Sequence, residues 1–403
     1  MKENDLVLSN YGKANMVLQE SVAYVNVSVD AGSSETRTHL WNGNPKSGGI
    51  YGISSEYAIV SGDISNTISQ TESLYDNMEI ILEDVTEGKE NKVFNNITIV
   101  KGGLFDDMRL TSAKTSSNIG KSLQDTTYIN TLANIGLRFY MNSYSTGKYN
   151  HKYKVNLTLA LPNEDVISNK RQDETKDRLY GDYVFSLPRY NFSINIEIPR
   201  GEILLVDEAK AALGSWRVTS KDKTNYENVL IIDAGGRSVD YSIMFKGRSL
   251  ARGSATGKYG GQKFVDTIME KYVNETGNDM PTRDMILDAL NSGLLQDGNS
   301  HIEISEFISK AKDEIASTII NEVSSLLDNN ELRIQQLNLV LCAGRLMRET
   351  VVDNTIKVKS LAYNIERQIK RRSPNTHVAM LSDEFALVKG LSMARYAFDS
   401  KNK

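Results

Sequence analysis

The chain has 403 residues, of which 40% are hydrophobic and 24% are charged, and its formal net charge is −4. This length predicts about two or three domains, and the composition is that of an ordinary globular protein. The near-neutral charge excludes the basic footprint of a protein that binds DNA directly. No apolar run reaches the roughly 18 to 20 residues that cross a membrane, and the single cysteine, Cys342, excludes an internal disulfide. We therefore expect a cytoplasmic protein that contacts neither membrane nor DNA.

The first clear pattern is an alternating stretch, Tyr24–Asp30, that runs into the turn Asp-Ala-Gly. Alternation resumes at 36–41, so the segment predicts a β-hairpin. Glycine at Gly32 permits a positive φ, and successive N–H groups in such a turn form a nest for an anion. The carboxylate of Asp30, at the end of its strand, is placed to hold a hydrated cation. The residues expected to bind phosphate here are Gly32, Ser33, Ser34 and Thr36.

The rest of the first half mixes clear segments with weaker ones. Residues 42–110 are rich in glycine, serine, asparagine and acids, which predicts a small polar subdomain. A helix is predicted at 126–140, and strands are predicted at 155–161 and 203–206. The charged stretch 163–200 is expected to form loops. A helix follows the last of these strands, with acidic residues in its first turn, where the helix dipole favours them.

The turn Asp-Ala-Gly occurs a second time, from Asp233 to Gly235, again directly after an apolar strand, Val229–Ile232. One such turn is common in hairpins, whereas two copies, each at the start of a strand–helix series, indicate a pair of phosphate loops. Asp233, like Asp30, ends its strand and is expected to hold the cation through water. The residues of this second loop expected at the phosphate are Gly235, Gly236, Arg237 and Ser238.

Helices and strands continue to alternate in the second half. Two glycines, 260–261, precede an amphipathic helix, and a buried strand at 337–343 ends at Gly344. The closing helix, from about 383 to 398, contains Gly390. Because glycine costs a helix roughly 1 kcal/mol relative to alanine, we expect another backbone to cross close to Gly390. Strands that alternate with helices in both halves predict α/β layers with mixed sheets.

Two common nucleotide motifs are absent. Gly253–Tyr259 is similar to a Walker A loop, but it has three residues between its glycines rather than four, and tyrosine stands where a hydroxyl must reach Mg²⁺. No Gly-x-Gly-x-x-Gly follows a strand, which excludes a Rossmann dinucleotide site. The two hairpins are therefore the candidate nucleotide site.

The order of elements resembles the actin-type ATPase fold, which actin, bacterial actin-like filament proteins, chaperone ATPase domains and sugar kinases share. Asp233–Asp240 is similar to that family's second phosphate loop, Asp-x-Gly-Gly-x-Thr-x-Asp, with Ser238 near the threonine position. Gly260–Phe264 resembles the Gly-Gly-x-x-Phe turn that follows this loop. Cys342–Arg345 stands where the family's adenosine motif has two or three glycines, here only one. The resemblance covers about residues 24–398.

The resemblance implies an α/β, actin-like fold of two similar domains, each with a mixed sheet flanked by helices, and a nucleotide cleft between them. Domain I would be 1–225, including the small subdomain at about 42–110, and the C-terminal helix, 383–403, would pack back on it. Domain II would be 226–382.

The resemblance also implies roles for particular residues. Glu208, in the family's first connecting segment, would orient the attacking water, and Asp233 would be the second catalytic residue. Asp30 and Asp233 would hold Mg²⁺ through water. The nucleotide would also contact Gly260, Gly261, Gly344 and Arg345. The nucleotide would be ATP, with GTP left open by the altered adenosine motif.

Within this superfamily the spacing and the Val-Asp-Glu-Ala-Lys segment from Val206 look most like the plasmid-segregating bacterial actins of the ParM type. That resemblance implies an ATPase that assembles into filaments and disassembles on hydrolysis. Its cargo would be plasmid DNA, reached through a DNA-binding adaptor protein. The alternative is a sugar-type kinase of the same superfamily, although no sugar-binding signature is recognisable.

Overall fold

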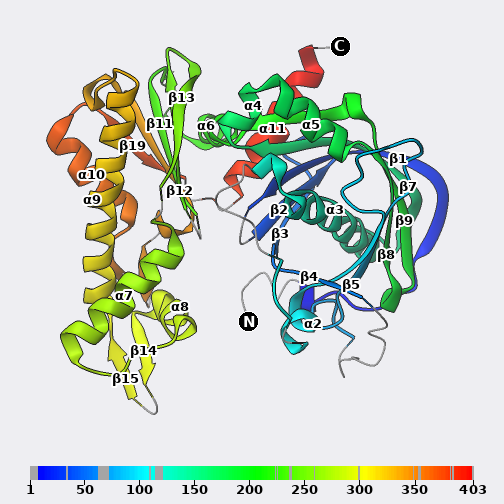
Figure 1. Cartoon of the computed structure of the whole chain (residues 1–403), viewed down its shortest axis with the longest axis horizontal. Helices are drawn as coiled ribbons and strands as arrows, with labels where there is room; N and C mark the ends of the chain where they lie inside the picture. Colours follow the sequence, from blue (N-terminus) through cyan, green and yellow to red (C-terminus); the bar gives the residue numbers. More distant parts are fainter. Residues whose placement is uncertain are drawn as a thin grey trace. The chain divides into compact units, whose positions relative to one another are not determined.

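A computed structural model describes residues 8–32, 35–61, 72–108, 110–113, 121–222, 224, 226–235, 238–257, 259–297, 300–347, 349–352, 355–381, 383 and 385–401. Contacts within the chain divide it into two units, Met1–Ser215 with Leu387–Lys403 (unit 1) and Trp216–Ala386 (unit 2) (Figure 1). The domain boundaries expected from the sequence stay predictions. Four expected site residues lie outside the described residues: Ser33, Ser34, Gly236 and Arg237.

Unit 1 is built on one sheet with the strand order β3-β2-β1-β7-β9-β8-β5-β6-β4, and β10 pairs with β7 (Figure 1). Its strands are β1 (Val17–Ala31), β2 (Glu35–Trp41), β3 (Gly49–Ser54), β4 (Ala58–Val60), β5 (Glu79–Asp84), β6 (Asn96–Val100), β7 (Lys148–Leu161), β8 (Gly181–Leu187), β9 (Phe192–Ile198) and β10 (Ile203–Asp207). β1 and β2 form the predicted antiparallel hairpin. β1 and β10 run parallel to β7, so the carboxyl ends of these three strands lie at the same edge of the sheet.

β1 is longer than the hairpin that it forms. Its pairing with β7 begins at Val17, whereas only Asn26–Ala31 pair with β2. Among the described residues, 17–25 therefore have a strand neighbour on one side only. The register with β7 shifts between Gln19 and Val22, as in a β-bulge. The side chains of Val17, Leu18, Val22 and Tyr24 are exposed.

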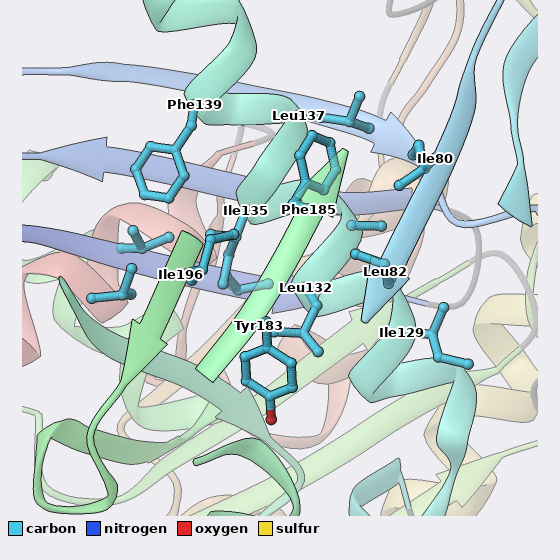
Figure 2. Close-up of a cluster of buried hydrophobic side chains, with 14 of the residues drawn as sticks. Ile80, Leu82, Ile129, Leu132, Ile135, Leu137, Phe139, Tyr183, Phe185 and Ile196 are labelled. Atoms are coloured by element: carbon cyan, nitrogen blue, oxygen red, sulfur yellow. The ribbon is translucent and has the colours of Figure 1, made fainter. Parts of the chain in front are cut away.

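Helix α3 (Asp125–Thr146) packs on this sheet and contributes to the core of unit 1. Its Leu132 and Phe139 lie among buried side chains of the strands, including Ile80 and Phe185 (Figure 2). Gly136 faces the Phe185 ring so closely that a Cβ would overlap it. The helix therefore rests directly on the sheet, and each large apolar side chain buried there contributes about 1.5–3 kcal/mol. The other helices with residues in unit 1 are α2 (Gly102–Asp107), α4 (Asn163–Ile167), α5 (Asn169–Leu179), α6 (Glu208–Thr219) and α11 (Ala386–Lys401).

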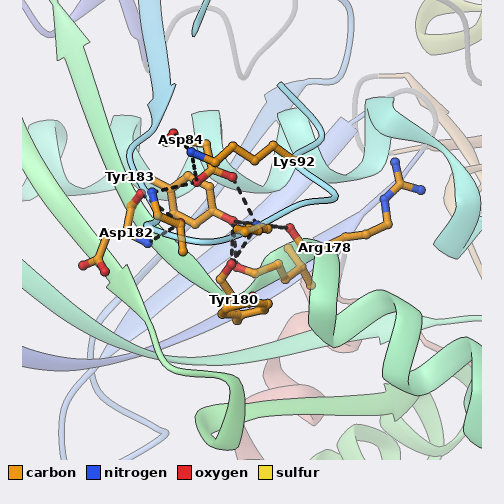
Figure 3. Close-up of polar contacts among 9 residues, drawn as sticks. Asp84, Lys92, Arg178, Tyr180, Asp182 and Tyr183 are labelled. Carbon is orange, nitrogen blue, oxygen red and sulfur yellow. Dashed lines mark hydrogen bonds and ion pairs between the residues drawn. The ribbon is translucent and has the colours of Figure 1, made fainter. Parts of the chain in front are cut away.

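A buried ion pair ties the segment after β5 to the start of β8 (Figure 3). Lys89 Nζ lies 3.1 Å from Asp84 Oδ2, and both side chains are 2% exposed. The same ammonium donates to the carbonyl oxygens of Arg178 and Tyr180 and to the Tyr183 hydroxyl, at 3.0, 2.8 and 3.0 Å. Every ammonium proton therefore has an acceptor, which is the condition under which a buried charge is tolerated.

The prediction of loops at 163–200 is wrong, because this stretch forms α4, α5, β8 and β9. α5 is a strongly polar helix whose buried side chains are Thr175 and Leu179, so it lacks the apolar stripe that sequence reasoning uses. In β8 and β9 buried residues alternate with exposed or half-buried ones, as in strands with one buried face. Their high content of polar residues concealed this alternation.

Unit 2 contains a mixed sheet in the order β13-β12-β11-β16-β19, in which β11 is antiparallel to β12 and parallel to β16. The strands are β11 (Val229–Ala234), β12 (Val239–Phe245), β13 (Arg248–Gly257), β16 (Leu339–Ala343) and β19 (His377–Met380), with hairpins β14 (Leu294–Asp297)–β15 (Ser300–Glu303) and β17 (Thr350–Val352)–β18 (Thr355–Val358). The helices are α7 (Gly261–Thr276), α8 (Arg283–Ser292), α9 (Ser305–Asn329) and α10 (Leu361–Arg372). The α/β class with mixed sheets flanked by helices is confirmed. No helix in the described part of the chain has the length and apolarity to cross a membrane.

Candidate functional site

Two expected catalytic or metal-binding carboxylates of unit 1 lie at the carboxyl ends of neighbouring parallel strands. Asp30 is the penultimate residue of β1, and Glu208 follows β10 directly. Both strands pair with β7, where Val29 is in register with Leu159 and Asp207 with Leu161. Strand ends of this kind are where open α/β sheets bind ligands.

Asp207 and Glu208 are adjacent but have different environments. Asp207 is buried, and its Oδ1 accepts the Ala209 backbone N–H at 2.8 Å, which satisfies a free donor at the start of α6. Glu208 is the first residue of α6, and its side chain is 22% exposed. Asp207 therefore supports the helix, whereas Glu208 presents its carboxylate at the strand ends.

A lysine joins the two predicted carboxylates. Lys121 Nζ lies 2.6 Å from Glu208 Oε1 and 3.8 Å from Asp30 Oδ1. Arg37 Nη1 approaches the other Asp30 oxygen at 3.6 Å. The fold thus brings together three residues that are far apart in the sequence, and we call them the lysine cluster: Asp30, Lys121 and Glu208.

The backbone that carries Lys121 is held by three buried groups. Thr127 Oγ1 donates to the Lys121 carbonyl at 2.8 Å, and the Tyr128 hydroxyl donates to the Ser122 carbonyl. Asp165, which is fully buried after β7, accepts the Ser122 N–H at 3.1 Å. The ammonium group is therefore presented from a fixed turn.

The turn after β1 requires its glycine. A Cβ on Gly32 would lie 2.5 Å from the Glu35 carbonyl oxygen, well inside van der Waals contact. Ser55 Oγ donates to the Gly32 carbonyl at 2.7 Å and lies 2.9 Å from Thr36 Oγ1. Because the single Ser55 hydroxyl proton goes to Gly32, the Thr36 hydroxyl is the donor to Ser55. Thr36 is fully buried, so its hydroxyl is used inside the turn.

In unit 2 the structure brings Asp233 and Gly344 together. Asp233, in β11, is in register with Ala343 of β16. Gly344 has φ +99°, and a Cβ there would lie 2.7 Å both from Asp233 Oδ1 and from the Ala234 carbonyl carbon. A residue with a side chain would be strained and would displace the aspartate, so glycine is required at this point. Arg345 follows directly, at the start of the 3₁₀ turn Arg345–Met347.

The second predicted phosphate loop, which follows β11 in unit 2, is held by backbone hydrogen bonds. Gly235 N–H donates to the Ser238 carbonyl at 2.9 Å, and Gly261 N–H donates to the Gly235 carbonyl at 3.0 Å. Gly260 is the N-cap of α7, so the start of this helix lies at the loop. Ser238 Oγ donates to Asp240 Oδ2 at 3.1 Å, which fixes the outgoing strand.

Known proteins resemble this arrangement. A family model for the archaeal actin homologue MreB-like, C-terminal, matches residues 231–351, the segment that contains Asp233 and Gly344. No curated protein sequence matches the chain. The structure of Alp7A, an actin-like protein, is similar over 94% of this chain and 98% of that chain, at 12% identity and a TM-score of 0.66. The 15-stranded ParM filament from Clostridium botulinum is similar over 93% of this chain and 100% of that chain, at 16% identity and a TM-score of 0.61. Bacillus thuringiensis ParM with ATP is similar over 96% of this chain and 100% of that chain, at 11% identity and a TM-score of 0.60.

The chain has an actin-like fold. The similarity spans nearly the whole length of each of these proteins, so the actin-like architecture includes both units. At these identities the likeness establishes the fold, and the nucleotide and the filament in those descriptions belong to those proteins.

Sequence reasoning missed two residues of this actin-like chain, Lys121 and Asp165. Lys121 contacts Glu208 across 87 residues, and no local pattern marks such a contact. Asp165 did carry a signal, since it closely follows the predicted strand at 155–161, as Asp30 and Asp207 end theirs. A search for carboxylates at the ends of all predicted strands would have found it.

Proposed function

We propose that this actin-like protein is an ATPase whose nucleotide-dependent assembly forms filaments. The observation that carries the proposal is the lysine cluster, in which the Lys121 ammonium joins an aspartate at a strand end to a glutamate at the start of a helix. Phosphoryl transfer needs such groups, because its catalysis is mostly positioning and charge stabilisation. The Gly235–Gly261 contact and the Asp233–Gly344 approach in unit 2 support the same reading.

Each loop has a distinct task in this proposal. Backbone N–H groups of the turns that begin at Gly32 and Gly235 would bind phosphate oxygens, apart from those of the two glycines, which donate to the Asp30 and Ser238 carbonyls. Asp30 and Asp233, each next to the end of its strand, would supply through water the hard carboxylate oxygens that Mg²⁺ prefers. Bound Mg²⁺ would neutralise charge on the phosphate oxygens. Gly344 lets the backbone approach the nucleoside.

Glu208 is the proposed water-orienting residue. Its carboxylate accepts hydrogen bonds from the water and aligns it with the γ-phosphorus. Lys121 Nζ donates to Glu208 Oε1 at 2.6 Å and so fixes the position of this carboxylate. An anionic phosphate competes for the same ammonium, so Lys121 connects phosphate binding to the state of Glu208.

Filament formation and cargo are further parts of the proposal. Protomers that stack head to tail make a contact that does not close, which produces a filament. Loss of the γ-phosphate contacts on hydrolysis lowers the affinity between protomers. The ParM resemblance adds plasmid DNA as cargo, bound through an adaptor protein, with ATP as the nucleotide.

The first test measures assembly and hydrolysis together. Light scattering should rise with Mg·ATP above a critical protein concentration, and phosphate release should follow without any added sugar. Phosphate release that requires a sugar, with no rise in scattering, would favour the kinase alternative. Scattering that is independent of nucleotide would refute the proposal.

The second test assigns the residues. Glu208→Ala should keep ATP-driven assembly and slow phosphate release by about 100-fold or more, in the range of lost water activation. Glu306→Ala is the matched control, because Glu306 also lies in the first turn of a helix and its side chain is 78% exposed. Asp233→Ala should abolish Mg²⁺-dependent nucleotide binding. Unchanged phosphate release in Glu208→Ala would remove Glu208 from the mechanism, and normal affinity in Asp233→Ala would remove the cation site.

A further inference from the structure

Lys101, directly after β6, is a fully buried lysine that has no carboxylate within ion-pair distance among the described residues. Its Nζ donates to Asn130 Oδ1 at 2.7 Å and lies 5.7 Å from the centre of the Tyr57 ring. Burial lowers the pKa of Lys101 to about 7, while the charge of Glu56 acts in the opposite direction. Taking an ammonium out of water costs several kcal/mol. A methionine would fill similar space without this cost, so packing alone does not explain the lysine.

The ammonium fixes the orientation of Asn130. Lys101 Nζ donates to the Asn130 oxygen, so the amide nitrogen of Asn130 points the other way. That nitrogen, Nδ2, donates to the Ser55 carbonyl oxygen at 3.0 Å. Asn130 is buried in α3. Lys101 and the Ser55 carbonyl oxygen therefore hold Asn130 in the same orientation from its two ends.

Ser55 completes the connection to the first loop. Its hydroxyl donates to the Gly32 carbonyl at 2.7 Å and accepts from Thr36 Oγ1 at 2.9 Å. Both sides of the turn after β1 thus bond to one side chain. The chain of contacts runs from Lys101 through Asn130 and Ser55 to Gly32, and we call it the lysine relay.

We propose that Lys101 is a positioning residue that, through Asn130 and Ser55, holds the Gly32 turn in the form that binds nucleotide phosphates. This inference rests on the proposed nucleotide function. The relay also ties the segment that leads from β6 into α2 to the phosphate turn. A change at either end therefore alters the other through three defined hydrogen bonds.

The decisive variant is Asn130→Asp, because stability and positioning predict opposite results. A carboxylate next to the Lys101 ammonium forms the missing ion pair, so the fold keeps or gains stability. The same substitution places an acceptor against the Ser55 carbonyl oxygen, where Asn130 had a donor, and so breaks the relay. We expect KM for ATP to rise roughly tenfold with kcat within about twofold, the pattern of lost uniform binding.

Two further variants test the connection. Lys101→Met and Ser55→Ala should each raise KM by a similar factor, and the double variant should be little worse than either, because the two residues act in one chain. Lys92→Met, which alters the lysine that donates to the Asp84 carbonyl in the same unit, is the control and should leave KM unchanged. The unfolding free energy of each variant is measured in parallel.

The outcomes separate the relay from the function on which it rests. If wild-type protein binds ATP and Asn130→Asp keeps the wild-type KM, the relay is refuted while the nucleotide function stands. Additive effects of Lys101→Met and Ser55→Ala would also refute it. If the wild-type protein binds no nucleotide, the proposed function itself fails.

Discussion

Among the described glycines of unit 1, Gly390 makes the closest approach to another backbone, and a single added methyl group tests it. A Cβ at this position of α11 would lie 2.6 Å from the carbonyl carbon and 3.0 Å from the Cα of Ala211 in α6, and closer still to the carbonyl oxygen. Ordinary contacts of a Cβ begin at about 3.4 Å. Gly390→Ala therefore forces two helix backbones apart, as the sequence predicted from a glycine inside a helix.

The magnitude follows from two opposing effects. Overpacking costs about 1–3 kcal/mol, and the upper end applies here because backbone atoms cannot rotate away. The higher helix propensity of alanine returns about 1 kcal/mol. We expect Gly390→Ala to lower the free energy of unfolding by about 2 kcal/mol.

Gly214→Ala in α6 is the matched control, because nothing lies within 4 Å of its added Cβ. This variant keeps only the propensity gain and should be more stable than wild type by about 1 kcal/mol. Urea unfolding followed by circular dichroism measures both. If Gly390→Ala is as stable as Gly214→Ala, the helices do not cross at the distance described.

Three other predictions concern acid stability, a buried charge and the glycine that follows β16. Burial lowers the pKa of His39 from 6.5 to about 4, so the unfolded chain takes up the proton first as pH falls. The free energy of unfolding should therefore decrease between pH 6.5 and 4, by up to about 3 kcal/mol. Urea unfolding at several pH values tests this: if His39→Gln shows the same pH dependence of the unfolding free energy as wild type, His39 is not the cause. Lys89→Met leaves the Asp84 carboxylate buried beside the more distant Lys92, at 3.9 Å, and should lower the free energy of unfolding by about 3–5 kcal/mol, measured by thermal unfolding. Adding Asp84→Asn should restore much of this stability. No recovery in the double variant would mean that the broken ion pair is not the cause of the loss. Gly344→Ala should weaken nucleotide binding measured by calorimetry, with full affinity counting against the proposed approach of the backbone to the nucleoside.

The sequence predicted the parts of the site that obey local rules. Asp30 and Asp233 were predicted because a strand pattern and an Asp-Ala-Gly turn occur together at each. Glu208 was assigned through the family resemblance, and its contact with Lys121 agrees with a place at the strand ends. These roles remain proposals until they are measured.

The rest depends on contacts that only the folded chain creates. Lys121 meets Glu208 over 87 residues, and Lys101 stands in a stretch whose composition predicted a small polar subdomain, yet it is fully buried. Polar residues in α5, β8 and β9 hid two strands and a helix, because tertiary packing, and not local propensity, decides which of their faces is covered. Long-range pairing of this kind has no periodic signature.

The long first strand has a practical consequence for handling the protein. Residues 17–25 leave a row of backbone donors and acceptors without a strand neighbour in the described part of the chain, and Glu20 is the single charged side chain among them. Natural edges are usually guarded by several charges, by proline or by a twist. Here the register shift between Gln19 and Val22 is the main protection of this edge, so a regular register would favour edge-to-edge association of chains in concentrated samples. Replacing Val22 by lysine would be a conservative way to keep the purified protein monodisperse.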